Sequence, residues 1–171
     1  MVDLMKAIKY YTKRICFQEI PDEISFTYFI SGCPNRCPDC HSKHLWEDVG
    51  TFVTETLKTD LETSGRLCTC ILFMGGDDSA HVDSLKLCLD LCKKAGFKTA
   101  LYTGRTFETI DKELLLLLNY IKVGPFIKEL GGLKSENTNQ RLYKLNKNGE
   151  IIEDLTKKFR RTLDEDCNKS R

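Results

Sequence analysis

The sequence lacks any long hydrophobic run. The longest stretch of large apolar residues is the five leucines at 114–118, far short of the ~20 residues that span a bilayer as a helix. The N-terminal segment MVDLMKAIKYYTKR also has no apolar stretch of the kind that signal peptides contain. We therefore expect a cytoplasmic protein that makes no use of a membrane.

An excess of charge of one sign is also missing. The 171 residues include 26 basic and 25 acidic side chains, which gives a formal net charge of +1. This balance argues against general nucleic-acid binding, which needs a strongly basic surface. The length suits one globular domain. We expect that domain to span residues 1–159 and to be followed by a charged tail at 160–171.

Strand and helix patterns alternate along the chain. Short runs rich in apolar residues predict strands at 24–30, 70–74, 97–102 and 120–123. Apolar residues at helical spacing predict helices at 51–63, 82–95 and 106–118. Two further strands, at 140–145 and 150–152, are expected to form a hairpin through Asn148 and Gly149, and a short amphipathic segment follows at 153–159. The alternation indicates an α/β fold with a parallel sheet.

Glycine-containing turns follow four of the predicted strands. They contain Gly32, the pair Gly75–Gly76, Gly104 and the pair Gly124–Pro125. Ligand sites of parallel sheets lie at the carboxyl ends of the strands, and glycine lets a ligand approach the backbone closely. The sequence therefore predicts one binding site along this edge of the sheet.

Nine cysteines are the most unusual feature of the composition. Their number is odd, and in a cytoplasmic protein thiols stay reduced. Metal ligation or reactive thiols therefore explain them better than a disulfide framework. The pairs Cys68/Cys70 and Cys88/Cys92 have the spacing of one strand face and one helix face, which favours small core residues over a second metal site.

Three cysteines lie within eight residues of one another, after the first predicted strand. Cys33, Cys37 and Cys40 share a loop with Pro34 and Pro38, and thiolates are suitable ligands for iron–sulfur clusters and for zinc. A structural zinc site needs a fourth ligand, for which His41 and His44 are candidates. From the residues alone, the cluster and the zinc site remain two open alternatives.

The C-x3-C-x2-C spacing resembles the cluster motif of radical S-adenosylmethionine (radical SAM) enzymes. The surrounding segment SGCPNRCPDCHSKHLW is similar to that of the short activating proteins of anaerobic ribonucleoside-triphosphate reductase. Further matches follow in the same order and cover about 21–145: Gly75–Gly76–Asp77, where many radical SAM enzymes have Gly-Gly-Glu, then YTG at 102–104, VGPFI at 123–127 and TNQR at 138–141.

The resemblance implies a partial, open (β/α)6-type radical SAM barrel with parallel strands. By the same resemblance, Cys33, Cys37 and Cys40, in a cluster loop at 31–46, hold a 4Fe-4S cluster that binds and reductively cleaves S-adenosyl-L-methionine. Residues expected to contact the S-adenosylmethionine cofactor are Gly75, Gly76, Asp77, Thr103 and Asn139. A short barrel with an open side would admit a loop of a protein substrate.

The activity implied by the resemblance is the generation of a glycyl radical on a partner enzyme. The implied partners are the glycyl-radical subunit of anaerobic ribonucleoside-triphosphate reductase and a reduced flavodoxin- or ferredoxin-type electron donor. Longer activases of other glycyl-radical enzymes carry an inserted ferredoxin-like cysteine set, which this sequence does not contain. Two alternatives stay open: an activase of another glycyl-radical enzyme, and a zinc-binding interaction module without catalysis.

Overall fold

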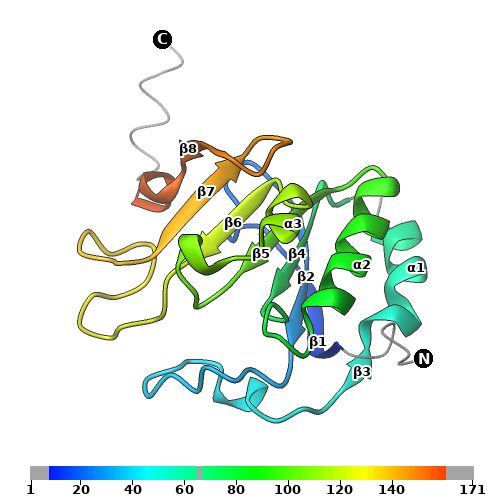
Figure 1. Ribbon diagram of the computed structural model, residues 1–171, viewed down its shortest axis with the longest axis horizontal. Coiled ribbons are helices and arrows are strands. Elements are labelled where there is room, and N and C mark those ends of the chain that lie inside the picture. The colour runs from blue at the N-terminus through cyan, green and yellow to red at the C-terminus, as the bar shows by residue number, and fades with distance from the viewer. Residues whose placement is uncertain (1–7, 65–66, 161–171) are drawn as a thin grey trace.

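The computed structural model describes residues 8–64 and 67–160. In this part of the chain, eight strands form one open sheet in the order β3-β1-β2-β4-β5-β6-β7-β8 (Figure 1). The strands are β1 Lys9–Cys16, β2 Ser25–Ile30, β3 Thr51–Phe52, β4 Cys70–Met74, β5 Lys98–Tyr102, β6 Tyr120–Val123, β7 Arg141–Leu145 and β8 Ile151–Asp154. The predicted α/β fold with an open sheet and parallel strands is confirmed.

The parallel part of the sheet consists of β2, β4, β5 and β6. All four of these strands were predicted, as was the antiparallel hairpin of β7 and β8. Antiparallel strands extend the sheet at both edges, and β1 and β3 at the first edge were not predicted. β1 carries the basic residues Lys9, Lys13 and Arg14 among its aromatic ones and has no residue in the fully buried class, so its hydrophobic pattern is weak.

Within the described residues, three α-helices lie between the strands: α1 Val53–Ser64, α2 Val82–Lys94 and α3 Lys112–Leu116. The predicted helix at 106–118 is wrong in its first half, which forms the 3-10 turn η3 Phe107–Thr109. Ile110 is buried in an extended conformation, and Asp111 then caps α3 by accepting hydrogen bonds from the N–H groups of Glu113 and Leu114. The helix predicted at 51–63 starts two residues later, because Thr51 and Phe52 pair with β1.

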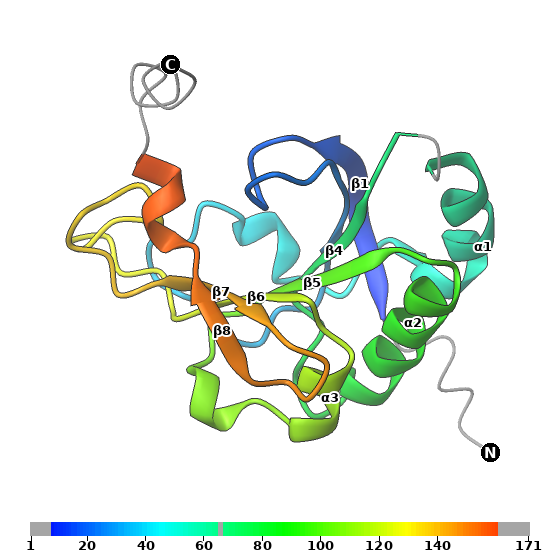
Figure 2. The same cartoon turned by 90° about the horizontal axis from the view of Figure 1, so that it is seen from above.

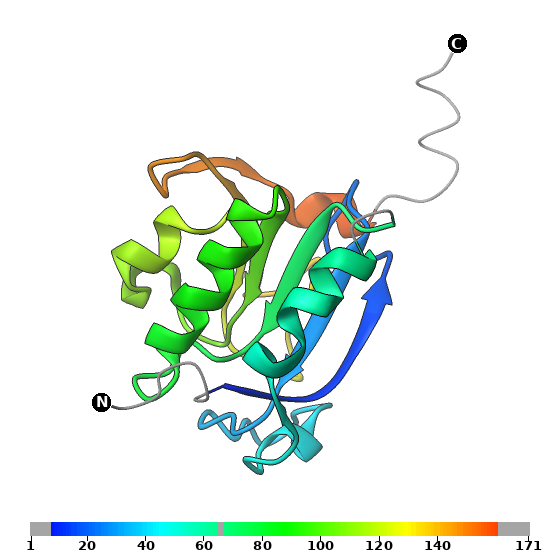
Figure 3. The same cartoon turned by 90° about the vertical axis from the view of Figure 1, so that its right-hand side faces the viewer.

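The helices cover one face of the sheet. Figure 3 shows α1 and α2 side by side across it, and Figure 2 shows α3 on the same side. Leu57 of α1, Leu89 of α2 and Leu114 of α3 are buried here against strand residues such as Ile71 and Leu101. This burial of helix and strand side chains forms the larger of the two cores.

Loops and a 3-10 turn cover the opposite face. The smaller core contains Leu72 and Ala100 from the strands, Ile20 from the segment before β2 and Leu155 from the segment after β8. The predicted amphipathic segment at 153–159 contributes the 3-10 turn η4 Thr156–Arg160. The predicted tail lies outside the described residues except for Arg160, which ends η4. Within the described ranges, no helix is long and apolar enough to cross a membrane.

Candidate metal centre and ligand cavity

The cysteine loop leaves the carboxyl end of β2 and returns to it. The N–H of Gly32 donates to the carbonyl of Glu47 at 3.1 Å, and that of Cys33 donates to the carbonyl of Leu45 at 2.9 Å. A 3-10 turn, η2 Lys43–Leu45, closes the loop and buries the Leu45 side chain. The loop is thereby fixed to the edge of the sheet at which the ligand site was predicted.

The three loop thiols are half-buried. The backbone N–H of Ser42 lies 3.3 Å from the Cys40 sulfur, and the N–H of Cys40 donates to the carbonyl of Cys37 at 3.0 Å. Burial raises the pKa of the Cys33 thiol, although hydrogen bonds from the backbone N–H groups of Asn35 and Arg36 act in the opposite direction. N–H groups directed at sulfur stabilise thiolates and tune iron–sulfur clusters.

The two histidines of the loop are packed against aromatic rings. The His41 ring lies 4.9 Å from that of Phe126, and the His44 ring lies 4.9 Å from that of Tyr11. In the described part of the chain, no three His, Cys, Asp or Glu side chains converge on a point that one metal ion would occupy. The structure thus gives each imidazole an aromatic neighbour.

A cavity of about 200 Å³ joins the cysteine loop to the ends of the parallel strands. Of the predicted site residues, those that line it are Cys33, Cys40, Gly75, Gly76, Asp77 and Thr103. Cys37 and Asn139 are not among its lining residues. The structure therefore brings most of the predicted set to one place, although these residues come from segments 70 residues apart in the sequence.

The Gly75–Gly76 turn forms one wall of this cavity. Both residues have positive φ angles, +95° and +92°, which residues other than glycine rarely adopt. The N–H of Gly75 donates to the carbonyl of Tyr102 at 2.9 Å, which ties the end of β4 to the end of β5. The turn presents backbone without side chains to the cavity.

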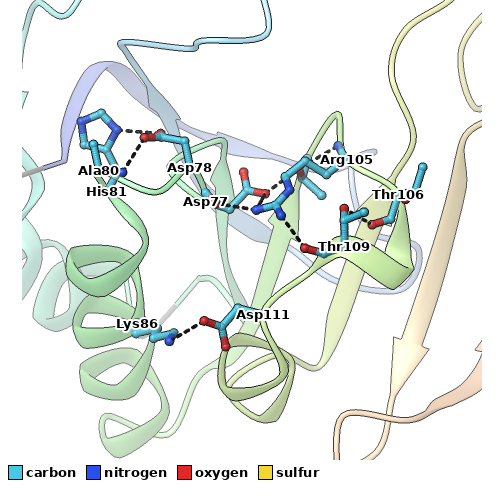
Figure 4. Close-up of polar contacts among 10 residues, drawn as sticks. Asp77, Asp78, Ala80, His81, Lys86, Arg105, Thr106, Thr109 and Asp111 are labelled. Atoms are coloured by element: carbon cyan, nitrogen blue, oxygen red, sulfur yellow. Dashed lines mark hydrogen bonds and ion pairs between the residues drawn. The ribbon is translucent and has the colours of Figure 1, made fainter.

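Asp77 is fixed by residues that follow β5 (Figure 4). The Thr103 hydroxyl donates to the Asp77 carboxylate at 2.7 Å, and the Arg105 guanidinium donates to the Asp77 carbonyl at 3.0 Å and to the Thr109 carbonyl. The Asp77 side chain is buried, and burial raises its pKa against the opposing effects of Thr103 and Arg105. The carboxylate thus has one orientation at the cavity wall.

The TNQR segment holds the turn that follows β6. Asn139 donates to the carbonyl of Pro125 at 2.9 Å, and Gln140 donates to that of Gly124 at 3.2 Å. A Cβ at Gly124 would lie 3.1 Å from the carbonyl oxygen of Asn139, so the turn and this segment are in close contact. The contact of Asn139 with a cofactor stays a prediction.

Lys122, Arg105 and Trp46 line the cavity but were not predicted as site residues. The Trp46 ring lies 6.0 Å from the Arg36 guanidinium and 5.6 Å from the Lys43 ammonium. A usable signal existed for Lys122, because it interrupts the otherwise apolar strand YIKV directly before Gly124. Arg105 follows the TG pair after β5, but arginine is too common in loops to mark a site.

Residues 24–151, about three quarters of the chain, match the family described as 4Fe-4S single cluster domain. The chain belongs to this family. Domains of this type are typical of radical SAM activating enzymes, and the family implies one 4Fe-4S cluster. No curated protein matches the sequence.

The residues present fit such a cluster. Three half-buried thiols share one loop, and N–H groups face two of their sulfurs. The core interpretation is confirmed for Cys70, Cys88 and Cys92, which belong to the two hydrophobic cores, whereas Cys68 is buried but lines a separate pocket beside Thr69 and Lys98. The family match favours the cluster over the zinc alternative.

Proposed function

We propose that this protein is a radical SAM activase that generates a glycyl radical on anaerobic ribonucleoside-triphosphate reductase. The observation that carries the proposal is the shared cavity, which places two thiols of the cysteine loop beside the Gly75–Gly76 turn and Asp77. Family membership supports a 4Fe-4S cluster domain of the activase type. In this proposal Cys33, Cys37 and Cys40 hold the cluster.

When bound, the cluster supplies the electron that splits S-adenosylmethionine into methionine and a 5′-deoxyadenosyl radical. Cys33, Cys37 and Cys40 would supply three thiolates to a cluster of four irons, so the loop by itself would leave one iron for a ligand from outside the chain. The radical takes a hydrogen atom from a glycine Cα of the partner, which yields 5′-deoxyadenosine and the glycyl radical. The chain itself binds and orients the reactants and limits water access.

The cavity residues bind the amino-acid part of S-adenosylmethionine in this proposal. The Asp77 carboxylate pairs with the ammonium group, while Thr103 and Arg105 hold Asp77 in position. Gly75 and Gly76 let the substrate approach the backbone, since a larger side chain would strain both positions.

The open sheet supports a protein substrate. Its strand order ends at β3 on one side and at β8 on the other, so the sheet does not enclose the cavity. The choice of the reductase as partner rests on the resemblance of the cysteine segment and on the lack of an inserted ferredoxin-like cysteine set. The proposed electron donor is a reduced flavodoxin- or ferredoxin-type protein.

The test is an anaerobic assay of the full chain reconstituted with iron and sulfide. Reductant and S-adenosylmethionine are added, and 5′-deoxyadenosine is measured with and without the reductase. We expect product from the wild type and from Cys88→Ala, but none from Cys37→Ala. The proposal is wrong if the protein takes up one zinc ion and no cluster, or if a fully loaded cluster gives no product even with the reductase present.

The partner is tested separately by electron paramagnetic resonance (EPR). We expect a glycyl-radical signal on the reductase after incubation with the activase, reductant and S-adenosylmethionine. A signal on a different glycyl-radical enzyme, with none on the reductase, would keep the activase chemistry and replace the partner.

A further inference from the structure

The cysteine loop carries two exposed cations, Arg36 and Lys43. The Arg36 guanidinium lies 6.0 Å and the Lys43 ammonium 5.6 Å from the centre of the Trp46 ring, so one aromatic side chain holds both cations close together. Trp46 lines the cavity, whereas the two cations are not among its lining residues. The loop therefore presents two positive charges to solvent beside the cavity.

Arg36 has a backbone conformation that favours glycine. Its φ angle is +40°, a region that residues with a side chain adopt at a cost and that glycine adopts freely. The turn itself therefore does not require arginine. Within residues 8–64 and 67–160, no carboxylate lies within ion-pair distance of Arg36 or Lys43, and the Asp39 carboxylate of the same loop lies 3.9 Å from Lys128 instead. Both positive charges are thus open to a partner molecule.

Exposed aromatic side chains extend this surface from the loop to β1. His44 follows Lys43 directly, and its ring lies 4.9 Å from that of Tyr11, which is 51% exposed. We call Arg36, Lys43, His44 and Tyr11 the basic rim. Aromatic and arginine side chains are enriched at protein–protein interfaces, and in the proposed function the neighbouring cavity is occupied by S-adenosylmethionine. The basic rim is therefore a surface for a protein and not for the small ligand.

We propose that the basic rim is the docking surface for the protein that donates the electron, and that this donor has an acidic surface. The inference rests on the proposed function, in which the loop thiolates hold a reducible cluster. A cluster bound by three thiolates is net negative and by itself repels an acidic donor. Arg36 and Lys43 offset this charge on the exposed side of the loop and make the encounter attractive. The docked donor gives up one electron and is oxidised by one electron, the cluster is reduced by that electron, and no bond forms or breaks in this step.

The test measures how fast two reductants reduce the cluster of the reconstituted full chain, without the reductase and without S-adenosylmethionine. One reductant is fully reduced flavodoxin, an acidic protein, and the other is photoreduced 5-deazaflavin, a small molecule that needs no docking surface. Stopped-flow absorbance gives the rate constants for the wild type, Lys43→Gln, Arg36→Gln, the double variant and Lys147→Gln. Lys147 is the matched control, because it is an exposed lysine in the turn between β7 and β8, beside the amino end of β6.

At low ionic strength, we expect flavodoxin to reduce the double variant about tenfold more slowly than the wild type, because electrostatic steering changes association rates by about ten- to a thousandfold. Each single variant should be slower by about threefold, and added salt should lower the wild-type rate towards that of the double variant. Lys147→Gln should stay within about twofold of the wild type. With deazaflavin, all the proteins should agree within about twofold. Lys43→Gln alone decides the test if substitution of Arg36 prevents cluster loading.

Three results would overturn the inference. Unchanged flavodoxin rates in the variants would place the donor elsewhere, equal slowing with both reductants would mean that the cations act on the cluster itself, and equal slowing in Lys147→Gln would reduce the effect to net charge. The proposed function is measured separately, as 5′-deoxyadenosine formed with deazaflavin, S-adenosylmethionine and the reductase. Absence of this product together with the expected flavodoxin rates contradicts the proposed function alone, whereas a protein that takes up zinc and no cluster contradicts both.

Discussion

Two groups of cysteines in this chain share one chemistry and have different surroundings. Cys33, Cys37 and Cys40 lie half-buried on a loop at the carboxyl end of β2, beside a cavity. The second group, which we call the core cysteines, is buried on β4, on α2 and in the segment before β4: Cys68, Cys70, Cys88 and Cys92.

The surroundings decide what each group can do. The backbone directs N–H groups at the sulfurs of Cys33 and Cys40, and such donors favour metal ligation; at Cys33 they oppose the burial that raises the pKa of this thiol. Burial raises the pKa of every core cysteine, to about 12 for Cys88. A thiol that stays protonated behaves as a small hydrophobic side chain.

Cluster loading gives the largest expected difference between the two groups. After anaerobic reconstitution, Cys37→Ala should hold almost no cluster iron, whereas Cys88→Ala should hold as much as the wild type. Iron and sulfide analysis with visible absorbance provides the measurement. Full loading of Cys37→Ala, or loss of loading in Cys88→Ala, would reverse the assignment of the two groups.

Alkylation of the apoprotein is the next largest effect. At pH 8 Cys88, whose pKa is raised to about 12 by burial, is ionised to only about one part in ten thousand, and its side chain is closed to solvent, whereas Cys37 and Cys40 are half-exposed. Iodoacetamide should therefore modify Cys37 and Cys40 at least ~100-fold faster than the core cysteines. Peptide mass spectrometry over time follows each site, and equal rates in the folded protein would contradict the burial.

The stability of the apoprotein should respond in the opposite order. Cys88→Ala removes a packed sulfur and should cost about 1 kcal/mol, whereas Cys37→Ala should change the free energy of unfolding by less than about 0.5 kcal/mol. Urea unfolding of both variants measures this. A larger loss of the free energy of unfolding in Cys37→Ala than in Cys88→Ala would show that the loop thiols stabilise the fold.

The same core pKa shift predicts a pH dependence. The pKa of Cys88 in the folded state is raised to about 12. The contribution of this thiol to the free energy of unfolding is therefore complete below the unfolded pKa of ~8.5 and is lost as pH rises toward 12. Urea unfolding between pH 8 and 10 should therefore show a steeper loss for the wild type than for Cys88→Ala. If the free energy of unfolding fell equally with pH in the wild type and in Cys88→Ala, the raised pKa of Cys88 would be contradicted.

The smallest expected effect concerns the contact between the cysteine loop and the sheet. A Cβ at Gly104 would lie 2.8 Å from the side-chain nitrogen of Asn35. Gly104→Ala should shift that side chain and weaken S-adenosylhomocysteine about two- to fivefold, since a small misplacement reduces binding and reactivity. Gly132→Ala is the control, because its Cβ would meet only Gln140 at 3.9 Å. Equal affinity in both variants would show that this contact does not position the loop.

Sequence reasoning found the parts of the fold with strong local patterns. The strands at 70–74 and 120–123 were predicted with the bounds of β4 and β6, because each is a short apolar run that ends at glycine. β1 was missed because its basic residues obscure any hydrophobic pattern. β3 was missed because it has only two residues, and they form a strand only by pairing with β1. The helix predicted at 106–118 was too long because Asp111 caps α3 at that point, which the spacing of the leucines does not indicate.

The candidate site was predictable where its residues form motifs. The cysteine spacing and the Gly75–Gly76–Asp77 turn are local in sequence, and the structure brings them together at one cavity. Lys122 and Arg105 were missed because only the folded chain forms their surroundings: the cavity that Lys122 lines, and the contact of Arg105 with Asp77.

The most direct test of the difference between the two cysteine groups is EPR spectroscopy of the reduced, reconstituted protein with and without S-adenosylmethionine. We expect the signal of one reduced 4Fe-4S cluster per chain, a change in that signal when S-adenosylmethionine binds, and no signal from Cys37→Ala. A cluster signal that S-adenosylmethionine leaves unchanged, or one that persists in Cys37→Ala, would contradict the proposal that the loop thiolates hold a cluster with a position open to the ligand.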